Sequence, residues 1–91
     1  MDIDIGHDPD ARRFSALVDG HTGYASYQLE DGVMTIDHTI VPREIGGRGI
    51  AGALVKAALE HARAEGWTVR PTCSYADTWM RRHPEYEDMR A

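Results

Sequence analysis

Alternating apolar and polar positions run through residues 12–41 and predict β-strands over this part of the chain. The pair Asp19-Gly20 predicts a tight two-residue hairpin, because both residue types tolerate the left-handed backbone that such turns need. A second turn is expected at residues 30–32, where Asp31 precedes Gly32. We therefore expect an antiparallel meander of three strands, at residues 13–18, 21–29 and 33–41.

The third predicted strand carries polar residues, and its pattern predicts which face each one occupies. Strict alternation over residues 33–41 places His38 on the same face as Ile36 and Ile40. The same alternation places Thr39 on the opposite face of the sheet.

The pattern changes at Pro42, where a glycine-rich loop begins. Beyond it, apolar residues recur at helical spacing and predict one long helix at about residues 48–65. Gly66 supplies its C-terminal stop, because glycine adopts the left-handed conformation in which helices commonly end.

A short β-prone segment at 67–72 follows the long helix. Ser74 and Asp77 resemble a capping box that opens a short helix ending near Arg82, and the last residues form a turn and a docked tail. The element order is therefore β-β-β-α-β-α. We expect an α+β fold with a mixed sheet, in which a crossover helix joins the antiparallel meander to one parallel strand.

Length, charge and cysteine content restrict the class of protein. A chain of 91 residues suffices for one domain, expected over residues 1–91 with its core at about 10–90. Ten basic against 15 acidic residues give a net charge of -5, which argues against a nucleic-acid partner. The single cysteine, Cys73, excludes an internal disulfide framework and favours a reducing, cytoplasmic setting. The sequence has neither the pattern of a signal peptide nor an apolar run that would span a bilayer, so no membrane partner is expected.

The glycine-rich loop at residues 46–52 predicts an anion site. Glycines allow a ligand to approach the backbone closely, and the unpaired amides of a helix start attract phosphate oxygens. Gly47, Gly49 and Gly52 satisfy the dinucleotide pattern G-x-G-x-x-G, but the preceding strand belongs to a meander and no ribose-binding acid follows at the usual spacing. The alternative is a strand-to-helix turn that binds nothing.

The segment from Val41 to Val55, with the strands before it and residues 67–86 after it, resembles the GNAT superfamily of acyl-CoA-dependent acetyltransferases. More narrowly, it is similar to the minimal single-domain branch, with a His-Thr-x-Val strand before the loop and a Pro-x-Cys-x-Tyr segment after it. The resemblance covers about residues 10–90. Glu44 departs from the family pattern, which has Gln or Arg there, and a carboxylate pointing inward would repel pyrophosphate.

The resemblance implies that acetyl-CoA binds at the glycine loop and along the end of the third strand. Backbone amides of the loop would hold the coenzyme A pyrophosphate, with Arg43 and Arg48 supplying positive charge beside Glu44. The strand amides would polarise the acetyl carbonyl. The implied coenzyme-binding residues are Thr39, Ile40, Val41, Gly46, Gly47, Arg48, Gly49, Ile50 and Ala51.

Two side chains are candidates for chemistry. Cys73 follows the fourth predicted strand and precedes a helix, whose N-terminus lowers the pKa of a thiol. The resemblance places this cysteine beside the thioester, as nucleophile, proton donor or pocket wall. His38 is a candidate base, with a polar residue of purely structural role as the alternative. The five histidines show no metal-ligand spacing, so no metal site is expected.

The predicted function is transfer of acetyl from acetyl-CoA to a primary amine. The acceptor is a protein lysine, a polyamine or a small metabolite, and the sequence does not distinguish among them. The main alternative is a non-catalytic acyl-CoA-binding or sensor module, favoured by Glu44 and by the absence of an obvious general base. A further alternative is an interaction domain without a ligand.

Overall fold

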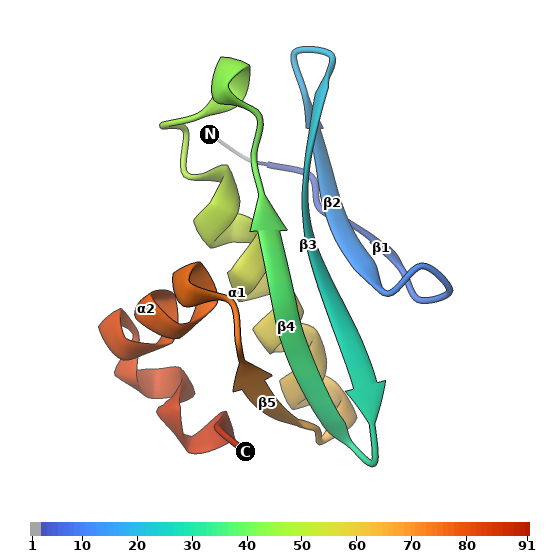
Figure 1. Cartoon of the computed structure of the whole chain (residues 1–91), viewed down its shortest axis with the longest axis vertical. Coiled ribbons are helices and arrows are strands. Elements are labelled where there is room, and N and C mark those ends of the chain that lie inside the picture. The colour runs from blue at the N-terminus through green and yellow to red at the C-terminus, as the bar shows by residue number, and fades with distance from the viewer. Residues whose placement is uncertain (1–2) are drawn as a thin grey trace.

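The computed structural model describes residues 3–91, which form one sheet and two α-helices (Figure 1). The elements in chain order are β1 (Gly6–Asp8), β2 (Arg13–Val18), β3 (His21–Glu30), β4 (Val33–Ile40), the 3-10 turn η1 (Arg43–Ile45), α1 (Ile50–Glu65), β5 (Thr68–Pro71), α2 (Ser74–Arg82) and the 3-10 turn η2 (Pro84–Met89).

The sheet has the strand order β1-β2-β3-β4-β5, so every strand lies next to its neighbour in sequence. The first four strands are antiparallel, and β5 pairs with β4 in parallel after the chain has crossed over through α1. The expected α+β fold is confirmed. Both predicted hairpin turns also form: Asp19 and Gly20 have φ of 50° and 77°, and Asp31 and Gly32 have 52° and 74°.

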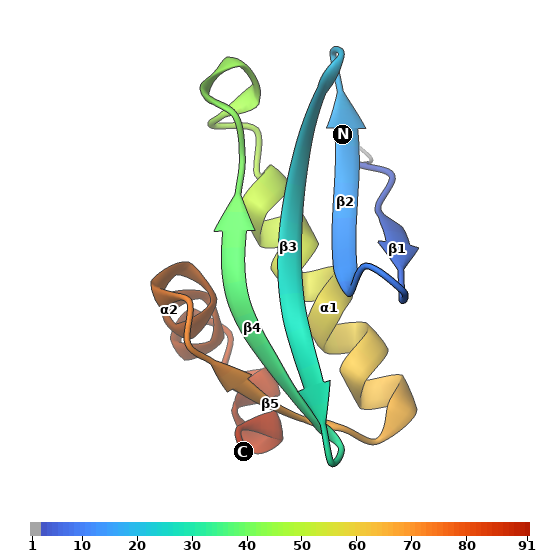
Figure 2. The same cartoon turned by 45° about the vertical axis from the view of Figure 1, so that its right-hand side comes forward.

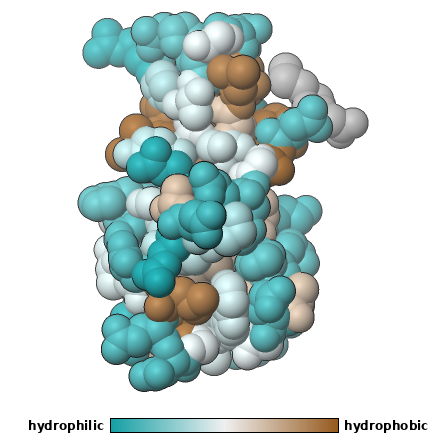
Figure 3. Space-filling model, turned by 90° about the vertical axis from the view of Figure 1, so that its right-hand side faces the viewer, coloured by the Kyte–Doolittle hydropathy of each residue, from teal (hydrophilic) through white to brown (hydrophobic). Residues whose placement is uncertain are grey.

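Both α-helices pack on one face of the sheet, where the hydrophobic core forms (Figures 1 and 2). Side chains from strands and helices meet there because the sheet and α1 each have an apolar face to bury. The largest fully buried side chains include Met34, Ile36, Leu54, Leu59 and Val69. Seen from the β1 side, the surface is mostly hydrophilic with separate hydrophobic patches (Figure 3). Among the described helices, none is long and apolar enough to cross a bilayer.

A β-bulge in β4 corrects the predicted alternation of its faces. Tyr27 pairs with Ile36 and Ser26 pairs with His38, so Asp37 is an extra residue without a partner on β3. Side chains beyond this point therefore exchange faces. Thr39 pairs with the buried Ala25 and lies on the core face, whereas His38 lies on the uncovered face and does not share a face with Ile36.

Three local features also differ from the sequence predictions. The short edge strand β1 was not expected; it pairs with β2 and places His7 opposite Phe14. The long helix begins at Ile50 rather than at residue 48, because Gly49 is in the left-handed conformation with φ of 77°. The expected capping box at Ser74 does not form, because Cys73 occupies the N-cap position and Ser74 is already helical.

Candidate functional site

The glycine loop places the start of α1 beside the end of β4. Gly47 and Gly49 both have φ of 77°, which side chains other than glycine rarely adopt. Gly49 is the N-cap of α1, and the first helical hydrogen bond runs from the Ala53 amide to the Gly49 carbonyl at 3.1 Å. The loop residues that follow Ile45 therefore turn directly into the helix.

The first turn of α1 fits an anion. The amides of Ile50, Ala51 and Gly52 precede the first helical hydrogen bond and have no backbone partner among residues 3–91. Residues 50–53 contain no acidic side chain that would compete for them. Free amides at the positive end of a 16-residue helix are the groups that bind phosphate oxygens elsewhere in proteins. These residues fit the pyrophosphate of a coenzyme.

Two other residues predicted to bind the coenzyme, Gly46 and Arg48, already have partners within the protein. The Gly46 amide donates to the Arg43 carbonyl at 3.1 Å and so is not free for a ligand. Arg48 Nη1 lies 2.5 Å from Oδ2 of Asp19, in the β2–β3 hairpin, which ties the loop to that hairpin. In η1 only Ile45 is buried, and Glu44 is exposed to solvent.

Strands β4 and β5 separate at the candidate acyl site. Their parallel pairing ends at Ile36 and Pro71, and the amides of Thr72 and Cys73 both donate to the Ile36 carbonyl, at 3.1 and 3.0 Å. Residues 37–40 of β4 therefore have no partner strand on the β5 side within the described chain. The predicted residues Thr39, Ile40 and Val41 lie along this free edge. Their side chains alternate: Ile40 is 47% exposed on the uncovered face, whereas Val41 packs against the core.

Cys73 lies at the N-terminus of α2 and contacts Thr39. The two atoms Cys73 Sγ and Thr39 Oγ1 are 3.6 Å apart, and both side chains are half-buried. Burial raises the pKa of the Cys73 thiol, but this effect is outweighed. The amides of Ala76 and Tyr75 and the hydroxyl and amide of Thr39 favour the thiolate, so the pKa lies below its ordinary value. The two helix amides act without forming a capping hydrogen bond to the sulfur.

His38 does not join Cys73. The bulge at Asp37 directs His38 to the uncovered face of the sheet, where its side chain is exposed. Asp37 is held on that face by Ser26, whose hydroxyl donates to Oδ1 at 2.7 Å. The role of His38 as a base stays a prediction, and among residues 3–91 no three His, Cys, Asp or Glu side chains gather to hold a metal ion.

Gly52 allows α2 to pack closely against the first turn of α1. A Cβ atom at Gly52 would lie 3.1 Å from Trp79 Nε1 and 3.3 Å from the Tyr75 hydroxyl oxygen. The Tyr75 hydroxyl therefore lies beside the free amides of α1, and Tyr75 is only two residues from Cys73. Burial raises the pKa of Tyr75, although Arg82 opposes this effect, so the hydroxyl keeps its proton at neutral pH. Only the packing of α2 against α1 shows where the Tyr75 hydroxyl lies, and no pattern in the sequence indicates it.

Comparison with known proteins shows which proteins this chain is similar to. The family model described as GCN5-related N-acetyl-transferase matches residues 13–89. Protein NATD1 of mouse is 33% identical over 85 residues, which cover 90% of this chain and 77% of that protein. Protein NATD1 of Xenopus tropicalis is 35% identical, with 90% and 78% covered.

A solved structure shares the fold. The NMR solution structure of a GCN5-like, proposed N-acetyltransferase from Staphylococcus aureus aligns with a TM-score of 0.73 and 28% sequence identity. The alignment covers 99% of this chain and 87% of that one. The sheet, the crossover helix and the α2 region are thus shared with a protein of this kind.

Proposed function

This chain belongs to the GCN5-related N-acetyltransferase family, and on that premise we propose that it transfers acetyl from acetyl-CoA to a primary amine. One observation carries the proposal. Cys73 contacts Thr39 where β4 and β5 separate, and the close packing of α2 on Gly52 brings the first turn of α1, with its free amides, beside the same helix α2.

The chain's own groups have distinct roles in this proposal. Acetyl-CoA supplies the acetyl group as a thioester. The amides of Ile50, Ala51 and Gly52 bind the pyrophosphate, aided by the positive end of α1. Backbone amides that point to the free edge of β4, those of Thr39 and Val41, polarise the acetyl carbonyl.

Cys73 receives the acetyl group first. Its thiolate attacks the carbonyl carbon, a new carbon–sulfur bond forms, and the bond to the coenzyme sulfur breaks. The coenzyme thiolate leaves and takes a proton from water. A neutral amine then attacks acetyl-Cys73, which forms the amide, restores the Cys73 thiolate and releases the amine proton to water.

A second candidate function is a sensor that binds acetyl-CoA without turnover. The exposed position of His38, on the uncovered face of the sheet, favours this alternative because it leaves no histidine beside Cys73 among the described residues. The glycine loop serves equally well in both functions. The two proposals differ only in whether an amine becomes acetylated.

Titration calorimetry and mass spectrometry test these proposals. Coenzyme A should bind and raise the melting temperature, because a ligand of the folded state stabilises it. Incubation with acetyl-CoA should add one acetyl group to the wild-type chain and none to Cys73→Ala. Lack of binding at millimolar coenzyme by folded protein would contradict both functions.

The Cys73 variants separate chemistry from binding. Cys73→Ser keeps a similar size and should bind coenzyme A like the wild type while losing transfer to a diamine or lysine peptide. Wild-type transfer by Cys73→Ala would show that the amine attacks acetyl-CoA directly. Acetylation of Cys73 without any amine product, across basic, neutral and acidic acceptors, would favour the sensor.

A further inference from the structure

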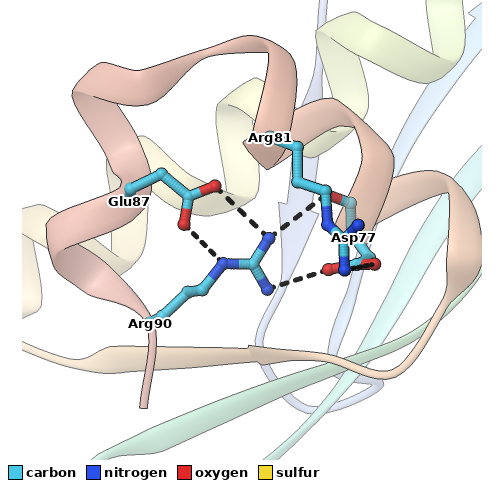
Figure 4. A network of polar contacts seen from close by, with 4 residues as sticks. All are labelled: Asp77, Arg81, Glu87 and Arg90. Carbon is cyan, nitrogen blue, oxygen red and sulfur yellow. Dashed lines mark hydrogen bonds and ion pairs between the residues drawn. The ribbon is translucent and has the colours of Figure 1, made fainter.

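The end of the chain is bound to α2 through Arg90. Its guanidinium makes a 2.9 Å ion pair from Nη1 to Oδ1 of Asp77, and Nη2 donates to the Asp77 carbonyl at 3.3 Å. On its other side Nε contacts Oε2 of Glu87 at 2.6 Å (Figure 4). Arg90 therefore holds both the main chain and the side chain of one residue of α2.

The tail itself is docked on the sheet. Arg90 forms a parallel bridge with Val69 of β5, and the Ala91 amide donates to the Val69 carbonyl at 2.8 Å. The Arg90 side chain thus connects the edge of the sheet to α2. It is half-buried and binds carboxylates with a planar fork, so its position is well defined.

Asp77, the residue that Arg90 binds, lies in the first turn of α2. The Asp77 amide donates to the Cys73 carbonyl at 3.0 Å and closes the first turn of the helix. The amides of Tyr75 and Ala76, which face the sulfur, lie inside this turn. Asp77 therefore connects Arg90 to the helical turn that surrounds the Cys73 sulfur.

We propose that Arg90 is a positioning residue for the candidate acyl site: by binding Asp77 it fixes the first turn of α2, and with it Cys73, against Thr39. This inference rests on the proposed function for its catalytic meaning. The contacts that carry it belong to the tail and to α2, and they do not depend on any ligand.

Charge gives Arg90 a second effect on the same site. The Asp77 carboxylate lies one helical turn from Cys73, where a negative charge disfavours a thiolate. Arg90 and Arg81 both pair with this carboxylate, at 2.9 and 3.3 Å, and offset its charge. Loss of Arg90 should loosen the turn and also expose Cys73 to more of the Asp77 charge, and both effects disfavour the thiolate.

The test measures the thiol without any coenzyme. Cys73 is the only cysteine, so the rate of alkylation by iodoacetamide as a function of pH reports its thiolate fraction. In Arg90→Gln the midpoint of this profile should move to higher pH. The alkylation rate at neutral pH should fall by about threefold, as expected for half a pKa unit.

Matched variants distinguish positioning from general weakening. Arg81→Gln removes the other ion pair to Asp77 and so tests the charge effect alone. Because Arg81 is 72% exposed and does not reach the tail, the shift of the profile should be clearly smaller than in Arg90→Gln. Arg63→Gln removes contacts of η2 with α1, to the Glu85 carbonyl and Asp88, and should lower the melting temperature without moving the profile. Arg90→Lys keeps the charge without the fork, so it should give an intermediate profile and a folded protein if Arg90→Gln unfolds.

An unchanged alkylation profile in folded Arg90→Gln, or in Arg90→Lys if only that variant folds, would overturn the proposal. An equal shift in Arg81→Gln or Arg63→Gln would also overturn it, because the effect would then not belong to the Arg90 contact. Failure of the wild type to bind coenzyme A would remove the acetyltransferase function and leave the shift in thiol reactivity as a separate result.

Discussion

Cys73 Sγ and Thr39 Oγ1 lie 3.6 Å apart across the point where β4 and β5 separate, although the two residues are 34 positions apart in sequence. The thiol donates to the hydroxyl oxygen, and once the thiol is ionised the hydroxyl turns to donate to the sulfur. Thr39 reaches the sulfur because the bulge at Asp37 moves it to the core face. The reactivity of Cys73 thus depends on an irregularity in the neighbouring strand.

Replacement of Thr39 by valine should make Cys73 less reactive. Thr39→Val removes the hydroxyl and keeps the branched shape, so the pKa of Cys73 should rise and alkylation at neutral pH should slow by about threefold. Thr39→Ser retains the hydroxyl and should behave like the wild type. Identical profiles for the valine variant and the wild type would exclude Thr39 as a partner of the thiolate.

Replacement of Gly49 by valine should weaken coenzyme binding by at least about tenfold, equivalent to about 1.4 kcal/mol. A Cβ at Gly49 meets no atom within 4 Å, so the cost comes from φ of 77° and from the new side chain beside the free amides. Gly66→Val is the matched control, since Gly66 has φ of 76° at the other end of α1. It should lower stability while leaving calorimetric affinity for coenzyme A unchanged. Equal affinities for folded Gly49→Val and wild type would make the loop a structural turn.

Folding stability should fall on acidification because of His7. Burial and the neighbouring His61 lower the pKa of His7 in the folded state, with Asp8 opposing them. The unfolded chain therefore binds the proton more readily, and this contribution to stability is present above the ordinary pKa near 6.5 and lost as the pH falls below it. His7 stacks on Phe14 with 4.1 Å between ring centroids, and its Nε2 lies 2.7 Å from the Tyr27 hydroxyl.

Urea unfolding at several pH values checks this effect. His7→Phe keeps a ring on Phe14 but cannot titrate, so its free energy of unfolding should fall less than that of the wild type between about pH 7.5 and about pH 5.5. The difference in free energy of unfolding between the two proteins should therefore shift in favour of the variant across this interval. If the free energy of unfolding changes equally with pH in both proteins, His7 does not contribute to the loss of stability on acidification.

Loss of the Tyr86 hydroxyl should weaken the docking of the tail on α1. Tyr86 is buried and donates a short hydrogen bond to Oε1 of Glu60, which raises its pKa to about 12 and keeps the phenol neutral. Tyr86→Phe should lower the free energy of unfolding by about 1 kcal/mol. For a chain of this size that corresponds to a melting temperature lower by about 4–8 °C. Because Glu60 is exposed, Glu60→Gln should cost less than Tyr86→Phe.

Features that depend on neighbouring residues could be predicted from the sequence. The turns at Asp19-Gly20 and Asp31-Gly32 need residues that tolerate positive φ, and apolar spacing predicted the α1 segment and the strands around it. The order of elements then leaves few topologies, which is why the parallel position of β5 was predicted correctly. A glycine cluster at a helix start likewise predicts free amides by local geometry alone.

The tertiary structure decided which predicted residues meet. Asp37 and His38 are both polar, so nothing in the alternation predicts an extra residue there, yet it reverses the faces of Thr39 and His38. The contacts from Cys73 to Thr39, from Arg48 to Asp19 and from Arg90 to Asp77 join residues that are far apart in sequence. Such contacts depend on how the elements pack, whereas local pattern determines only which elements form.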